Sequence, residues 1–289
     1  MLNPNLIYEN QKYVHLMLGS KGGIGKTYVL CYLAEYMLSI GKTLTIIDTD
    51  TANSWLKETK FYNAVDFDMF DTDKLISFEK VPEIFSMFPD RNLVIDTGAN
   101  SYSAWFEYLS NGGDEEIQIY GSKLMIHVPI TPGSSLNECI RCLEQLVDKN
   151  FNCRFAIWLN NSASPKSSPF TIDDFDELPI FKKMEQQLPF VTELPTCDPA
   201  SRKLVNEIHD NHYALSEIAD ASDDKLSSYT LYHRPASAMD KFRANYYRDK
   251  ILNSFNVDIN PRCFHIYKES ELNFLFHGST VSVDWSNTF

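Results

Sequence analysis

The chain has 289 residues, and its 26 lysines and arginines against 39 aspartates and glutamates give a formal net charge of −13. Such an acidic surface excludes a protein that coats nucleic acid or anionic lipid with its whole surface, so any contact with a polyanion must be local. The first residues carry no secretory signal, and no run approaches the roughly 18 apolar residues that span a bilayer. We therefore expect a cytoplasmic protein without a membrane segment.

The length fits one large α/β domain with a C-terminal appendage. No repeat, low-complexity tract or linker divides the chain before about residue 220. We predict a main domain over 1–220 and an appendage over 221–289, with a helix from about Ala236 to Phe255. Residues 256–289 have no clear period and are left unassigned. The six cysteines are scattered, which indicates reduced thiols.

Apolar and β-branched runs predict strands at Tyr13 to Leu18, Thr43 to Asp48, Asn92 to Gly98, Lys123 to Ile130, Arg154 to Asn161 and Pro189 to Pro195. Helical spacing predicts helices at Lys26 to Gly41, Leu136 to Lys149, Ile172 to Gln187 and Pro199 to His209. Strands that alternate with helices predict an α/β fold with a mostly parallel, doubly wound sheet flanked by helices. Ligands of such a sheet bind beyond the C-terminal ends of its strands.

The stretch "SKGGIGKTY", from Ser20 to Tyr28, follows the first strand and leads into the first helix. Its glycines allow a tight loop whose amides point inward, its second lysine supplies a charge for the β- and γ-phosphates, and its threonine offers a hydroxyl to Mg²⁺. The strict phosphate-loop pattern requires glycine at Ser20, but the order of strand, loop and helix is the required one. A glycine-rich turn without a ligand is the alternative. The candidate nucleotide-binding residues are Gly22, Gly23, Ile24, Gly25, Lys26, Thr27 and Tyr28.

Lys21 followed by Gly-Gly-x-Gly-Lys-Thr resembles the deviant Walker A loop of the ParA/MinD superfamily of P-loop ATPases. The resemblance covers about residues 13 to 210. It implies a P-loop NTPase sheet, ATP and Mg²⁺ as cofactors, and a homodimer formed on ATP binding in which Lys21 reaches the partner's phosphates. Hydrolysis would then depend on dimerisation, whereas the alternative for Lys21 is an ordinary solvated lysine. Tyr28 stands where the family often has a second threonine.

Two predicted strands end in carboxylates, which a magnesium-nucleotide site needs. Asp48 and Asp50 follow the second strand in "IIDTDTANSW", and Asp96 follows the next strand in "LVIDTGAN". The resemblance implies that Asp48 positions the attacking water, that Asp50 supports the site, and that Asp96 is the Walker B aspartate of the metal. Helix caps or loop residues are the alternative. The family usually has a proline at the position of Thr51, and it often has prolines after the Walker B aspartate, where this chain has "TGAN". These two departures concern how the protein switches between nucleotide states rather than whether it binds a nucleotide.

Two later segments resemble the family's base-binding elements. Asn160 ends "FAIWLN" and would hydrogen-bond adenine, while Pro195 in "ELPTCDPAS" would pack on the base. A turn asparagine is the alternative for Asn160. No guanine-type N-K-x-D motif is evident, which favours ATP.

The "CIRC" pair, Cys139 and Cys142, has the spacing of metal ligands, but its helical surroundings indicate two thiols on a half-buried helix. The histidines are isolated in the sequence, apart from His209 and His212. The predicted C-terminal helix carries four cations, and ParA-type proteins bind DNA nonspecifically through a basic patch. A solvated face interleaved with aspartates is the alternative. The candidate DNA contacts are Lys241, Arg243, Arg248 and Lys250.

Several segments, among them "VIDTGANS" and "MDKFRANYYRDKI", resemble ParA-like proteins encoded with plasmid stability and conjugative transfer. The implied function is a dimerising Mg-ATPase switch with slow, partner-stimulated hydrolysis. It would position or segregate a plasmid or transfer complex through a partner protein or DNA. Two alternatives use the same fold: a phosphoryl-transfer enzyme of metabolism, such as a dethiobiotin-synthetase-like ligase or kinase, and a nucleotide-binding adaptor that does not hydrolyse ATP.

Overall fold

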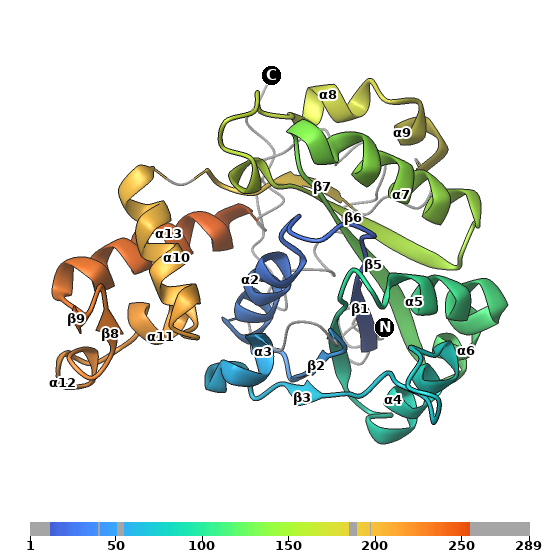
Figure 1. The fold of residues 1–289 in the computed structure, drawn as a ribbon, viewed down its shortest axis with the longest axis horizontal. Coiled ribbons are helices and arrows are strands. Elements are labelled where there is room, and N and C mark those ends of the chain that lie inside the picture. Colours follow the sequence, from blue (N-terminus) through green and yellow to red (C-terminus); the bar gives the residue numbers. More distant parts are fainter. Residues whose placement is uncertain (1–11, 40, 51–54, 185–189, 197, 255–289) are drawn as a thin grey trace, which may run out of the picture.

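A computed structural model describes residues 12–39, 41–50, 55–184, 190–196 and 198–254. Its centre is a seven-stranded sheet in the order β3-β2-β4-β1-β5-β6-β7, and all neighbouring strands in it are parallel (Figure 1). The strands are β1 (Lys12–Met17), β2 (Leu44–Asp48), β3 (Val65–Asp66), β4 (Asn92–Asp96), β5 (Ser122–Ile130), β6 (Cys153–Leu159) and β7 (Phe190–Glu193). The prediction of a mostly parallel, doubly wound sheet is confirmed.

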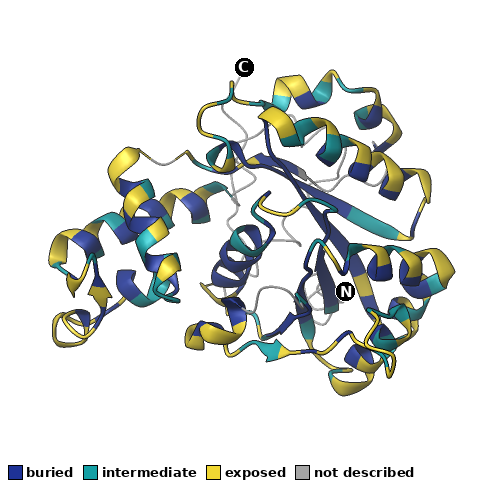
Figure 2. Cartoon of the chain, in the orientation of Figure 1, coloured by how far each residue is buried: buried dark blue, intermediate teal, exposed yellow. Residues whose placement is uncertain are grey.

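Helices cover both faces of this sheet, because successive side chains of a buried strand point to opposite sides. Tyr13 and Met17 of β1 belong to one apolar cluster, and Val14 and Leu16 belong to the other. The first cluster includes α2 (Lys26–Ser39), α3 (Trp55–Glu58), α10 (Pro199–Asp210), α11 (Leu215–Ala219), α12 (Asp223–Leu226) and α13 (Ala238–Ser254). The second includes α4 (Val81–Met87), α5 (Tyr102–Tyr108), α6 (Asp114–Ile119), α7 (Leu136–Asp148), α8 (Ile172–Asp176) and α9 (Pro179–Met184). In Figure 2 the central strands are mostly buried, whereas the short edge strand β3 is not.

One predicted helix, Ile172 to Gln187, is wrong. It is divided into α8 and α9, and residues 185–189 lie outside the described part of the chain. Pro179 stands at the division, where its ring and missing amide hydrogen prevent a helix from continuing. The elements α3, β3, α4 and α5, between residues 55 and 108, were given no bounds from the sequence, because runs of two to seven residues are too short to show a period.

The C-terminal helices form a group beside α2 (Figure 1). The helices α10 and α11 pack on α13, and a short hairpin of β8 (Thr230–Leu231) and β9 (Arg234–Pro235) precedes α13. We call residues 198–254 the C-terminal unit. The predicted helix from Ala236 to Phe255 is confirmed as α13, the boundary at residue 220 stays a prediction, and residues 256–289 lie outside the described part. Within the described ranges, no helix has the length and apolar character needed to cross a membrane.

Candidate functional site

The glycine-rich loop connects β1 to the first residue of α2, Lys26. Gly23 and Gly25 have φ angles of 75° and 92°, in the left-handed region that favours glycine. A Cβ atom at Gly25 would also lie 2.2 Å from the amide nitrogen of Asn160. That amide and the Thr131 hydroxyl both donate to the carbonyl of Ile24, at 3.0 and 3.1 Å. The ends of β5 and β6 therefore hold the loop in place, and Gly25 cannot be replaced without a shift.

The two lysines of the loop lie in different environments. Lys26 is 8% exposed, and its ammonium donates to the carbonyl of Lys21 at 3.1 Å. Burial lowers the pKa of Lys26, although the negative charge of Asp96 opposes this effect. The Lys21 side chain is 44% exposed, and its Nζ lies 3.2 Å from Glu138 Oε2 on α7. The loop thus has one inward cation and one outward cation.

The predicted carboxylates meet beside this loop. Asp48 and Asp96 are paired in register at the ends of β2 and β4, and the Thr27 hydroxyl donates to Asp96 Oδ2 at 2.6 Å. The amide of Asp50 donates to Asp48 Oδ1 at 3.0 Å. In contrast, Asp48 Oδ2 and Asp96 Oδ1 are buried without a hydrogen-bond partner among the described residues. The structure therefore brings together three residues from separate parts of the chain, with two carboxylate oxygens left over.

Burial is the main influence on the charge of these carboxylates. It raises the pKa of Asp48 to about 6 and the pKa of Asp96 to about 7, and the neighbouring aspartates contribute to both increases. A divalent cation would offset this repulsion. No group of three or more His, Cys, Asp or Glu side chains that could hold a metal occurs in the described ranges. The oxygen donors fit Mg²⁺, which keeps water ligands and shares phosphate oxygens.

The loop after β4 packs against the segment that contains Asp48 and Asp50. A Cβ atom at Gly98 would lie 2.3 Å from Asp50 Oδ1 and 2.3 Å from Asn100 Oδ1. A Cβ atom at this position would force these side chains to shift, so Gly98 lets the loop after β4 lie directly against Asp50. Thr51 lies outside the described residues.

A cavity of about 320 Å³ opens on the other side of the loop, beside Gly23, Gly25 and Asn160. It is also lined by Tyr28, Tyr32, Ser162, Ala163, Pro165, Leu194, Arg202, Val205, Asn206 and Tyr247. Pro195 adjoins this wall, since its carbonyl accepts a hydrogen bond from the Tyr247 hydroxyl at 3.2 Å. The sequence did not indicate that Tyr32, Arg202 and Tyr247 line a cavity. Their helical spacing predicts only that they lie on helices. A base-sized cavity is thus shared by the phosphate loop and the C-terminal unit.

Tyr28 also joins the loop to the C-terminal unit through stacked rings. The His209 ring lies between those of Tyr28 and Trp55, with centroid separations of 4.5 and 4.1 Å and interplanar angles of 11° and 6°. The Trp55 indole donates to the carbonyl of His209 at 2.8 Å. Burial lowers the pKa of His209 to about 4, so the ring is neutral at physiological pH. Aromatic contacts therefore connect α2, α3 and α10.

No family model matches the chain. It is 31% identical over 151 residues to Protein TraL of Escherichia coli, which covers 51% of this chain and 62% of that protein. This chain is similar to TraL. A second TraL protein of Escherichia coli is 29% identical over 151 residues. The chain spans about three fifths of the length of these TraL relatives.

Among solved structures, the MinD cell division protein of Aquifex aeolicus has a TM-score of 0.44 and 16% identity, and covers 81% of this chain and 96% of its own. A ParA family ATPase of Chlorobium tepidum has a TM-score of 0.42 and 16% identity, and covers 74% and 94% respectively. The fold of this chain rests on its own strand order rather than on these low scores.

The remaining candidates are the cysteine pair, which interacts electrostatically with Lys26, and the cations of α13. Cys139 and Cys142 are each 2% exposed, within the apolar cluster between α7 and the sheet. On α13, Lys241 pairs with Asp223, and Arg248 pairs with Asp220. Arg243 and Lys250 are about half a turn away from these two cations. The four cations predicted to contact DNA therefore do not share one face of the helix.

Proposed function

We propose that this chain is a Mg-ATP-dependent ATPase switch of the ParA/MinD kind. The observation that carries the proposal is the convergence of Thr27, Asp48 and Asp96, with two unpartnered carboxylate oxygens, beside a glycine-rich loop that contains a buried lysine. A base-sized cavity adjoins the same loop. This arrangement supports a nucleoside triphosphate with Mg²⁺, because a hydrated cation would satisfy the two buried carboxylate oxygens that have no partner among the described residues.

On this proposal the loop amides and Lys26 bind the β- and γ-phosphates, and the Thr27 hydroxyl and the Asp96 carboxylate hold the metal and its waters. When bound, Mg²⁺ neutralises phosphate charge. Asp48 orients the attacking water and accepts its proton, for which a pKa of about 6 is suitable near neutral pH. Asp50 supports this geometry through its backbone contact to Asp48.

The cavity beside Gly25 would receive adenine. Asn160 and Tyr28 both line it, and its volume is within the range of small-molecule sites. Pro195 would act from behind this wall, through the segment that Tyr247 holds.

Lys21 supports the dimeric form of the switch. Its ion pair with Glu138 is exposed, and such pairs contribute about 0–1 kcal/mol, so the lysine can leave it at little cost. It would then reach the phosphates of a second copy bound face to face. From the resemblance of the sequence, we propose that the nucleotide state controls a cytoplasmic partner protein, or DNA, in positioning or segregating a plasmid or transfer complex.

The solution mass of wild type and Lys21→Ala, measured with ADP or ATP and Mg²⁺, tests this proposal when phosphate release is followed on the same samples. We expect dimers with ATP only, slow turnover, and the loss of both in Lys21→Ala. Glu138→Ala is the matched control, because it removes the same ion pair and leaves the lysine.

Two outcomes would contradict the switch. A mass that responds neither to ATP nor to Lys21→Ala would favour a phosphoryl-transfer enzyme of metabolism, to be examined with metabolite acceptors. ATP-dependent dimers without turnover, even with added DNA, would favour a non-hydrolysing adaptor.

A further inference from the structure

A groove of about 400 Å³ lies where the C-terminal unit meets the end of α2. Its walls come from α2, from the 3₁₀ turn Lys60–Tyr62, from α11 with the residue that follows it, and from α13. The lining residues are Glu35, Leu38, Ser39, Phe61, Ser216, Asp220, Arg248 and Leu252. We call this hollow the α2–α13 groove.

Exposed apolar side chains from distant parts of the sequence meet in the groove. Leu38 is 43% exposed and Phe61 is 39% exposed, and Leu252 lies partly buried on the same lining. Single exposed apolar residues are normal on a protein surface, whereas several that line one hollow mark a place where another apolar surface packs. The groove is therefore suited to an apolar occupant.

The polar side chains of the groove are mostly bonded within the chain. Glu35 is 6% exposed and accepts from the hydroxyls of Tyr62 and Ser216, at 2.8 and 2.5 Å. Arg248 pairs with Asp220, and its Nε is buried without a hydrogen-bond partner among the described residues. A charged ligand would compete with bonds that the chain already makes. A peptide segment would not, and one of its carbonyls can accept from Arg248 Nε.

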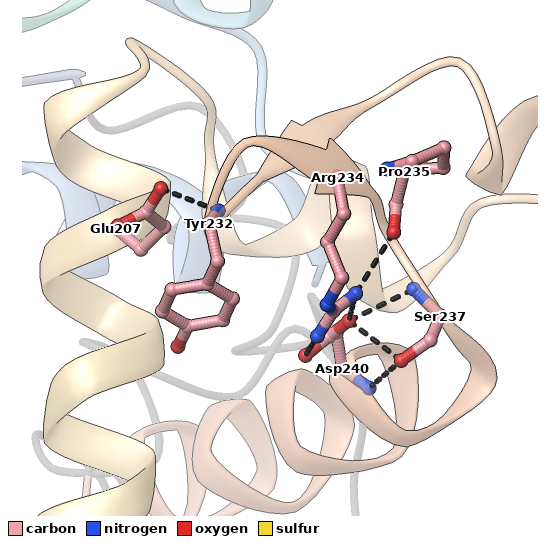
Figure 3. Close-up of polar contacts among 6 residues, drawn as sticks. All are labelled: Glu207, Tyr232, Arg234, Pro235, Ser237 and Asp240. Carbon is pink, nitrogen blue, oxygen red and sulfur yellow. Dashed lines mark hydrogen bonds and ion pairs between the residues drawn. The ribbon is translucent and has the colours of Figure 1, made fainter.

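The helix α13 is held at both ends, so the chain leaves it at a defined place. At its start, the Arg234 guanidinium donates to both oxygens of Asp240, at 2.8 and 3.1 Å, and the Ser237 amide donates to the same carboxylate (Figure 3). At its end, the Thr192 hydroxyl of β7 donates to the carbonyl of Ser254 at 3.2 Å. The next residues of the chain therefore start from a fixed point.

The sequence after α13 begins with a short alternating pattern. Phe255, Val257 and Ile259 alternate with polar residues in "FNVDIN". A period of two places the three apolar side chains on one side of an extended chain. Phe255 is also the third residue after Leu252, which lines the groove. An apolar side of the chain thus begins beside an apolar groove.

We propose that residues 255–260 occupy the α2–α13 groove as a strap within the same molecule. The strap is extended, and its three apolar side chains pack on Leu38 and Phe61. It ties α13 of the C-terminal unit to α2, the helix that begins at Lys26 of the phosphate loop. The inference goes beyond the proposed ATPase switch and needs no nucleotide.

This occupant is favoured over others by its connection to the groove. Residues 1–11 lead into Lys12, whose ammonium donates to the carbonyls of Pro89 and Tyr120, beside the helices α4 and α6 that cover the other face of the sheet. A second copy or a partner protein would have to compete with a segment that is joined to one wall of the groove. Such a joined segment has a high effective concentration.

The test places p-benzoylphenylalanine, a photo-activated cross-linker, at Phe61 of the full-length protein without nucleotide. An equal mixture of ¹⁵N-labelled and unlabelled protein is irradiated, and mass spectrometry identifies the cross-linked peptides and shows whether both come from one molecule. The matched control carries the cross-linker at Phe70, which is 38% exposed and does not line the groove. The Phe61 probe is also combined with Val257→Asp and with Asn256→Asp, and circular dichroism shows that each protein is folded.

We expect the probe at Phe61 to cross-link residues 255–260 of the same molecule, and the probe at Phe70 not to do so. The yield should fall by about tenfold or more in Val257→Asp, because the groove would have to bury an unpaired charge. It should not change in Asn256→Asp, which adds the same charge on the polar side. Cross-links from Phe61 to another segment, mixed-label cross-links to a second copy, no cross-link at all, or equal yields in the two aspartate variants would overturn the proposal.

Discussion

Two buried aspartates show how the phosphate-loop edge of the sheet differs from the C-terminal unit. Asp96 is 2% exposed and Asp240 is 1% exposed. Burial alone raises the pKa of Asp240, but donors from Arg234 and Ser237 outweigh it, so the pKa is lowered. At Asp96 the single hydrogen bond from the Thr27 hydroxyl does not offset the effect of burial, which raises the pKa to about 7. A carboxylate that has all its donors within the chain stabilises structure, whereas one with a bare oxygen is suited to bind a ligand.

The largest effect is expected for Asp240→Ala. The change leaves Arg234 without its partner and removes the carboxylate that accepts from the Ser237 amide and hydroxyl, so we expect the free energy of unfolding to fall by about 3 kcal/mol. Urea denaturation measures the loss, and Asp249→Ala, on the exposed side of α13, is the control. A loss below about 1 kcal/mol would show that the C-terminal unit does not depend on this contact.

Asp96→Asn should act in the opposite direction. The folded-state pKa of Asp96 is raised from 3.8 to about 7, so the fold favours the protonated carboxyl group. The stability that this protonated group contributes is lost as pH rises from 3.8 to 7. The neutral amide avoids this loss, so we expect the nucleotide-free variant to gain about 2 kcal/mol at pH 8. The gain should vanish below pH 4, where wild type is protonated as well. Urea denaturation at both pH values measures this, and a destabilised variant at pH 8 would contradict it.

His209 tests the connection between the two regions. Its pKa falls from 6.5 to about 4 because of burial, so the stability that depends on the neutral ring is present above pH 6.5 and is lost as pH falls towards 4. His209→Phe keeps a flat ring that does not titrate. Between pH 7.5 and 5, the free energy of unfolding of wild type should therefore fall by about 1–2 kcal/mol more than that of the variant. Thermal unfolding at pH 7.5 and 5 gives the difference. Equal losses in the two proteins would mean that the stack does not sense pH.

The smallest effect is expected for Glu138→Gln. The exposed pair with Lys21 contributes less than about 0.5 kcal/mol, so unfolding should barely change. The variant frees Lys21, and ATP-dependent dimers should form at least as readily as in wild type. Analytical ultracentrifugation measures this, and weaker dimers would indicate that Glu138 itself takes part in the interface.

Much of the site is local in the sequence and could be predicted from it. The glycines, Lys26 and Thr27 lie within six consecutive positions, and Asp48 and Asp96 end apolar runs whose C-terminal ends lie at one edge of a parallel sheet. The roles of these residues remain predictions of the resemblance. The walls of the base cavity could not be predicted, because Arg202 and Tyr247 reach it from helices far along the chain.

The sequence by itself determined six strands of the sheet, the phosphate loop and the longer helices, since each depends on neighbours within a few residues. Only the tertiary structure decided which distant side chains meet. His15 and His127, isolated in the sequence, lie 2.9 Å apart between ring nitrogens, and the Trp158 indole donates to His127 at 3.0 Å. It also paired Lys241 with Asp223 and Arg248 with Asp220. Contacts of this kind depend on how whole elements pack, and no local pattern records them.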